Sequence, residues 1–211
     1  MYSDERRSRN YYQGRARWYD WANRAVALLR GVSGTRERRQ AIEHLALRPG
    51  ARVLEVSVGT GTNLPLISTA LGGDVRLAGL DISPAMLDRC RWKLRSRKLE
   101  ADLIEGEAAH LPFAGGAFDA VLHHGGLAEF GDRKGAIAEM VRVAKQGARV
   151  VICDVGVPTD RRLSLVNRLL LRLQPQYEQP PPLDLIPAGV ADLNLSWFHG
   201  GAWYLIEFVV V

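Results

Sequence analysis

The sequence predicts an α/β protein with a doubly wound, mostly parallel seven-stranded sheet that ends in a C-terminal antiparallel hairpin. From residue 50 onward, short apolar runs alternate with helical patterns, which is typical of a parallel sheet covered on both faces. The last two apolar runs, 191–198 and 202–211, have only His-Gly-Gly between them. Two strands without an intervening helix indicate a hairpin.

The parallel part of the sheet follows from five apolar runs, expected as strands at 52–56, 74–81, 101–106, 118–124 and 148–155. Helices are expected between them, at 63–71, 84–98 and 132–144. The first of these helices stops at a Gly-Gly pair, and Ser83 followed by Pro84 is a favoured start for the second. Four residues form one apolar stripe along the second helix: Met86, Leu87, Cys90 and Leu94.

Composition places the chain among globular proteins. Of its 211 residues, 47% are apolar, and no apolar run approaches the roughly 20 residues that span a bilayer. The first ten residues contain no apolar signal core, and the two cysteines, Cys90 and Cys153, suggest neither a disulfide framework nor a metal site. A cytoplasmic protein is expected.

Positive charge is concentrated near the N-terminus. Residues 1–40 hold ten arginines against four acidic residues, so this segment carries +6 and the remainder is close to neutral. Two interpretations stay open: a solvated arginine-rich helical surface, or a face for an anionic membrane, RNA or acidic substrate.

The segment Val53–Asn63, "VLEVSVGTGTN", predicts the cofactor. An apolar strand that enters a glycine-rich turn and then a helix normally lies against a nucleotide-like group. The third glycine of a dinucleotide fingerprint and the Gly-Lys-Ser/Thr of a phosphate loop are both missing. Glu55 stands directly before the turn, where a carboxylate would repel a pyrophosphate but would suit a positively charged cofactor. S-adenosylmethionine carries a sulfonium and an ammonium and no phosphate, so it is the expected cofactor.

These motifs resemble the class I S-adenosylmethionine-dependent methyltransferases, closest to the branch that methylates quinones, phospholipids and natural products. The resemblance covers about residues 15–155, and Ser57 stands where the family's first glycine is usual. It implies the Rossmann-like fold of class I methyltransferases and a set of cofactor-binding residues. These are Tyr19, Glu55, Ser57, Gly59, Thr60, Gly61, Asn63, Asp81, Ile82, Met86, Glu107, Ala108 and His123.

Asp81 is expected to bind the ribose. It lies at the end of the second strand, 22 residues past Gly59, where a carboxylate can accept both ribose hydroxyls. The alternative is a favourable negative charge at a helix N-terminus. By resemblance, Ile82 and Met86 flank the adenine, and the pair at 107–108 meets its edge.

Candidate catalytic residues are His123, His124 and Tyr19. The donor methyl group is already activated, so a protein mainly positions the acceptor, and a base is needed only if the acceptor must lose a proton. The histidine pair follows the fourth strand, where it can act as a base or simply pack. Tyr19 matches a lid residue of the family. Trp18 and Trp21 can share a helical face, either as an aromatic cage or as ordinary packing.

The expected reaction is methyl transfer to a small, partly apolar acceptor such as a quinone, a lipid or a natural product. One domain is expected, with an N-terminal helical lid (1–45), a cofactor-binding core (46–155), an acceptor-side helix and loop (156–190) and the hairpin (191–211). The helix at 163–174 either walls the acceptor pocket or covers the sheet.

Two alternatives keep the fold. The chain can use S-adenosylmethionine for cyclisation or rearrangement, or only as a bound ligand, or it can methylate RNA or protein. The sequence "HHGGL" at 123–127 replaces the Asn/Asp-Pro-Pro-aromatic motif of base-amine methylases, which argues against methylation of base amines in nucleic acid. A nucleic-acid partner is not expected. The basic N-terminus would suit peripheral contact with an anionic membrane. Nothing in the sequence indicates the oligomeric state.

Overall fold

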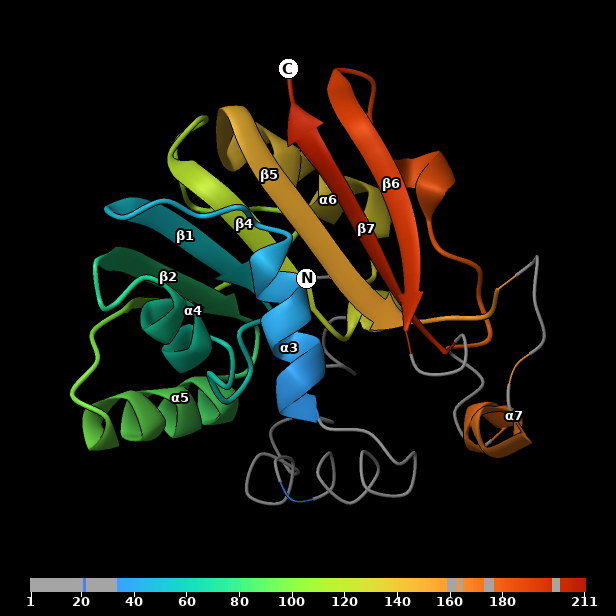
Figure 1. Cartoon of the computed structure of the whole chain (residues 1–211), viewed down its shortest axis with the longest axis horizontal. Coiled ribbons are helices and arrows are strands. Elements are labelled where there is room, and N and C mark those ends of the chain that lie inside the picture. The colour runs from blue at the N-terminus through green and yellow to red at the C-terminus, as the bar shows by residue number, and fades with distance from the viewer. Residues whose placement is uncertain (1–20, 22–33, 159–162, 164, 173–176, 199–201) are drawn as a thin grey trace.

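A computed structural model describes residues 21, 34–158, 163, 165–172, 177–198 and 202–211. Its centre is a seven-stranded sheet with the order β3-β2-β1-β4-β5-β7-β6 (Figure 1). The strands are β1 (Ala51–Val56), β2 (Val75–Asp81), β3 (Asp102–Glu105), β4 (Phe118–His124), β5 (Ala144–Val155), β6 (Val190–Phe198) and β7 (Trp203–Val210). β1 to β5 pair in parallel, whereas β7 pairs antiparallel with both β5 and β6. The predicted fold class is therefore confirmed.

The strand order places a crevice beside β1. β2 lies on one side of β1 and β4 on the other, so the chain winds in opposite directions from this point. The connections that leave β1 and β4 therefore diverge at the carboxyl ends of these strands, which is where doubly wound folds bind their ligands.

Helices cover both faces of the sheet. They are α3 (Gly34–Glu43), α4 (Leu64–Ala70), α5 (Pro84–Ser96), α6 (Arg133–Val143) and α7 (Leu165–Arg172), with short 3₁₀ turns η1 (Leu127–Glu129) and η3 (Leu183–Leu185). Figure 1 shows α3, α4 and α5 in front of the sheet and α6 behind it. Among the residues that the structure describes, each helix is too short or too polar to cross a lipid bilayer.

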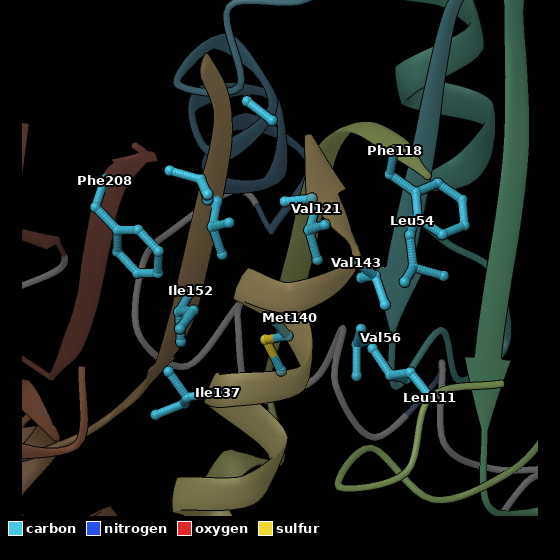
Figure 2. Packing of buried hydrophobic residues seen from close by; sticks show 14 of the residues in the cluster. Leu54, Val56, Leu111, Phe118, Val121, Ile137, Met140, Val143, Ile152 and Phe208 are labelled. Atoms are coloured by element: carbon cyan, nitrogen blue, oxygen red, sulfur yellow. The ribbon is translucent and has the colours of Figure 1, made fainter. Parts of the chain in front are cut away.

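The two faces bury separate hydrophobic cores because side chains alternate along a strand. Val53 belongs to the core beneath α3, α4 and α5, and its neighbour Leu54 belongs to the core beneath α6. Figure 2 shows Ile137 and Met140 of α6 among side chains of the strands, including Val121 of β4. Glu55 lies on the same face as Val53, so its carboxyl group is buried beneath the helices.

Local sequence explains where α5 begins. The Ser83 hydroxyl accepts a hydrogen bond from the Met86 amide at 3.4 Å, and Pro84 occupies the first turn. Both are the predicted starting signals. All four residues of the predicted apolar stripe are buried, which fixes α5 against the sheet.

The start of β5 differs from the expectation, and the expected N-terminal lid is described only in part. β5 begins at Ala144 rather than at 148, because the chain continues through an irregular pairing with β4 and accommodates Gly147 at φ +78°. Of the expected N-terminal lid, α3 is described, whereas Trp18 and Tyr19 lie outside the described residues.

Candidate active site

A pocket opens at the carboxyl ends of β1, β2 and β4. The space between its walls is about 910 Å³ when the solvent in its open mouth is counted. Ten of the predicted site residues line it: Glu55, Ser57, Gly59, Thr60, Asp81, Ile82, Met86, Glu107, Ala108 and His124. The sheet therefore brings together residues that are up to 69 positions apart, from 55 to 124.

Asp81 ends β2 with its carboxyl group fixed in the pocket wall. One oxygen accepts a hydrogen bond from the Gly59 amide at 2.8 Å, and the other accepts one from the Ser83 amide at 2.9 Å. Burial raises the pKa of Asp81 to about 6, although both amides favour the ionised form. Each oxygen keeps a second lone pair, so the group can also accept bonds from a ligand's hydroxyls.

Glu55, at the end of β1, is the second acid of the pocket. Its Oε1 accepts a 2.5 Å hydrogen bond from the Asn63 amide, and the Asn63 carbonyl accepts one of 2.8 Å from Arg38. Among the described residues, Oε2 of Glu55 is buried without a hydrogen-bond partner. Burial raises the pKa of Glu55 to about 8, despite the Asn63 bond and the positive charge of Arg38. A cation entering the pocket would supply the missing partner.

The glycine-rich turn between β1 and α4 needs left-handed backbone at three positions: Ser57 at φ +59°, Gly59 at +55° and Gly61 at +71°. Ser57 is strained there because its Cβ crowds the backbone, which a glycine would avoid. Gly61 has a packing role: a Cβ at this position would lie 2.3 Å from the Cys90 sulfur of α5. Gly61 and Asn63 therefore stand behind the pocket wall and support it.

The two predicted histidines occupy different positions. His123 is fully buried outside the pocket wall. Its Nδ1 lies 3.1 Å from the Val56 carbonyl, and its ring packs edge-on against Phe130, which does line the pocket. Burial lowers the pKa of His123 to about 4, so the ring is neutral. This position suits support of the wall.

His124 does line the pocket, from β4, the strand that pairs with β1 beside Glu55. Its ring lies 5.2 Å from that of Trp203, the first residue of β7. Among the described residues its Nδ1 is buried without a partner. Burial, aided by the positive charge of Arg38, brings the pKa of His124 well below its ordinary value. His124 is therefore neutral near pH 7 and has a ring nitrogen available for a ligand.

Asp154 shapes the loop that carries Glu129 and Phe130, two pocket-lining residues that form what we call the far wall. Its Oδ2 accepts hydrogen bonds from the amides of Leu127 at 2.6 Å and Ala128 at 3.3 Å. These bonds hold the turn η1, which ends at the wall residue Glu129 and is followed by the wall residue Phe130. Burial raises the pKa of Asp154 to about 6, which the backbone amides partly oppose.

A segment beyond α7 is attached to this far wall. The Tyr177 hydroxyl donates to Glu129 at 2.7 Å, and Arg133 donates to the side chain of Gln179 at 2.5 Å. The amide of Val157 also bonds to the Gln179 carbonyl. Part of the segment expected on the acceptor side is therefore bonded to the pocket wall at Glu129, whereas neither this segment nor α7 contributes a residue to the described wall itself.

Arg38 is the main pocket residue that the sequence patterns do not single out, because it stands among the many arginines of the basic N-terminal segment. It lines the pocket from α3. A signal was present: Arg38 precedes the buried residues Ala41, Ile42 and Leu45 by three, four and seven positions, so it shares their helical face. An arginine within an apolar stripe indicates a specific contact.

Comparison with known proteins gives the pocket a family context. Residues 53–147 match the family described as "Methyltransferase domain". A demethylmenaquinone methyltransferase of Thermus thermophilus is 34% identical over 151 residues, which is 72% of this chain and 67% of that protein. The corresponding enzyme of Deinococcus radiodurans is 36% identical, over 72% of this chain and 61% of its own length. The matched region thus spans about two thirds or less of these relatives.

A solved structure supports the fold independently. Phosphoethanolamine N-methyltransferase 2 of Haemonchus contortus, in a complex with S-adenosylhomocysteine, superposes with a TM-score of 0.73 at 16% identity. The match covers 94% of this chain and 59% of that one. Together with the fold and the glycine-rich turn, these matches show that the chain belongs to the class I S-adenosylmethionine-dependent methyltransferases, whose cofactor is S-adenosylmethionine.

Proposed function

We propose that this protein transfers the methyl group of S-adenosylmethionine to a small, quinone-like acceptor. The observation that carries the proposal is the buried Glu55 carboxyl group, which lines the pocket at the carboxyl end of β1 and whose Oε2 has no hydrogen-bond partner among the described residues. When bound, S-adenosylmethionine supplies a methyl group activated by a positively charged sulfur.

The pocket residues fit this cofactor along its length. Glu55 and Arg38 both line the pocket and are linked through the Asn63 side chain, so together they match the ammonium and carboxylate of an amino acid. Asp81 is held by two backbone amides and can accept the ribose hydroxyls. Apolar side chains that suit an adenine ring complete the wall: Leu80, Ile82, Met86, Ala108 and Ala109.

We assign the acceptor to the far wall, around His124 and Phe130. A hydroquinone ring becomes nucleophilic at carbon when a neighbouring hydroxyl loses its proton, and neutral His124 can receive that proton through a ring nitrogen. Phe130 would exclude water from the reacting atoms. His123 acts from behind as a support for Phe130, and Tyr19 remains a proposed lid residue.

The names of the relatives favour a quinone over the other acceptors. Both curated relatives described above are demethylmenaquinone methyltransferases. Phe130 and His124 both line the pocket, and Trp203 packs against the His124 ring, so the aromatic surroundings are suited to a flat, partly apolar ring. A cytoplasmic location belongs to the proposal, because both cysteines are free thiols.

The experiment combines the purified chain with S-adenosylmethionine and a reduced, short-chain demethylmenaquinone analogue. We expect S-adenosylhomocysteine and a product heavier by one CH₂ to form in equal amounts, with strongly reduced rates for His124→Ala. Product without S-adenosylhomocysteine would indicate cyclisation or rearrangement. Methyl label that enters only RNA or protein would overturn the proposed acceptor class.

A further inference from the structure

The helix α7 presents an unusual combination of side chains to solvent. Leu165 is 81% exposed and Leu169 is 61% exposed, and the two lie one turn apart on the same helical face. Arg168 and Arg172 are exposed on the same side, at the spacing that places all four residues within about a third of the helix circumference. The first turn of α7 contains no acidic residue.

The opposite side of α7 is attached to the protein. Asn167 is only 3% exposed, and it stands two positions from each leucine, about half a turn around the helix. Because the side of α7 that carries Asn167 is buried, Leu165 and Leu169 on the other side face solvent. Figure 1 shows α7 at the margin of the molecule, off the edge of the sheet rather than on either face.

We propose that this α7 face, formed by Leu165, Arg168, Leu169 and Arg172, docks on an anionic phospholipid bilayer. Leucines that enter the boundary between headgroups and acyl chains gain apolar burial, and adjacent arginines reach the lipid phosphates. The charge is complementary, since the chain carries +5 overall and its first 40 residues carry +6.

Docking through α7 would also orient the pocket. α7 follows β5, whose carboxyl end lies at the same edge of the sheet as the pocket. Tyr177, five residues after α7, donates its hydrogen bond to Glu129 in the pocket wall. A bilayer beneath α7 would therefore lie near the acceptor side. The docking itself does not depend on the identity of the acceptor.

The test measures flotation of the full chain with vesicles of phosphatidylcholine, with and without phosphatidylglycerol, at low and high salt. We expect salt-sensitive binding to the anionic vesicles only. Leu165→Ser with Leu169→Ser, or Arg168→Gln with Arg172→Gln, should lower the partition coefficient by about tenfold, since each arginine contributes substantially near an anionic surface.

Matched controls change equivalent residues elsewhere. Leu183 and Leu193 are also exposed, at 40% and 47%, so their double serine variant removes two leucines outside α7. Arg95→Gln with Arg97→Gln removes the same charge from exposed positions at the end of α5. Both controls should bind vesicles within about twofold of the unaltered chain, because two distant residues contribute independently.

Several outcomes would overturn the inference. These are no binding of the unaltered chain to anionic vesicles, undiminished binding of the α7 variants, or an equal loss in the α5 control. Sedimentation that shows a dimer converted to monomer by the leucine substitutions would assign the face to a second copy of the chain. Cofactor affinity and thermal melting of each variant verify folding, since α7 contributes no described residue to the pocket.

Discussion

The Glu55 carboxyl group shows how burial changes the chemistry of a single residue. Its pKa is raised on folding from 4.5 to about 8. Glu55 therefore stabilises the fold most at pH values below 4.5, and this contribution is lost as the pH rises toward about 8. A bound cation lowers the pKa of Glu55 again, because it favours the ionised carboxylate over the protonated form.

Cofactor binding should consequently release a proton from Glu55. At pH 7 we expect about one proton to leave per S-adenosylmethionine bound, because the carboxyl group is mostly protonated before binding and ionised afterwards. Calorimetry in two buffers with different ionisation enthalpies measures this number. Glu55→Gln should bind more weakly and release none. Equal binding enthalpies in both buffers for the unaltered chain would contradict the role assigned to Glu55.

Gly61 provides a second test at residue scale. Gly61→Ala should lower the free energy of unfolding by about 2–4 kcal/mol, because the new Cβ meets Cys90 and the backbone is left-handed. Cys90→Ala combined with Gly61→Ala should recover part of the loss by removing the sulfur. Denaturant titration measures both. No recovery in the double variant would show that the clash with Cys90 is not the cause.

At the scale of elements, the chain's local patterns predicted most of the secondary structure. The strands and helices from β1 to β4 follow from apolar runs, the Ser83 cap and Pro84, all of which act over a few residues. The start of β5 was not predictable in this way. Its first residues join the sheet through pairing with β4, a contact between segments far apart in the sequence. From the local sequence alone, Gly147 predicts a turn.

The position of α3 leads to a prediction about Arg38. Arg38→Gln should weaken S-adenosylmethionine binding by about 10- to 100-fold, because a hydrogen bond to a charged group is lost. Binding of decarboxylated S-adenosylmethionine should change by less than about threefold, since it lacks the carboxylate assigned to Arg38. Competition calorimetry compares the two ligands. A similar loss for both would mean that Arg38 acts only through the Asn63–Glu55 contact.

At the scale of the whole molecule, the site combines residues that no local pattern connects. The sequence predicted Glu55, Asp81 and His124, because each lies at or directly before the end of a strand and the strands of a parallel sheet end at one edge. Arg38 and Glu129 reach the same pocket through the packing of α3 and the loop held by Asp154. His124 lines the pocket and His123 does not, because consecutive residues of β4 point to opposite faces of the sheet. The residue type, which is the same at both positions, does not distinguish them.

Calorimetric titration of S-adenosylmethionine and S-adenosylhomocysteine into the unaltered chain and Asp81→Ala measures whether the pocket binds the cofactor through Asp81. We expect both ligands to bind the unaltered chain and to bind Asp81→Ala about 100-fold more weakly or worse, because two hydrogen bonds to a carboxylate are lost. Asp81→Asn, with a thermal melt of each variant, verifies that the loss does not reflect unfolding. Two results would contradict the assignment of this pocket to S-adenosylmethionine. One is a folded chain that binds neither ligand, and the other is an Asp81→Ala variant that binds both ligands as tightly as the unaltered chain.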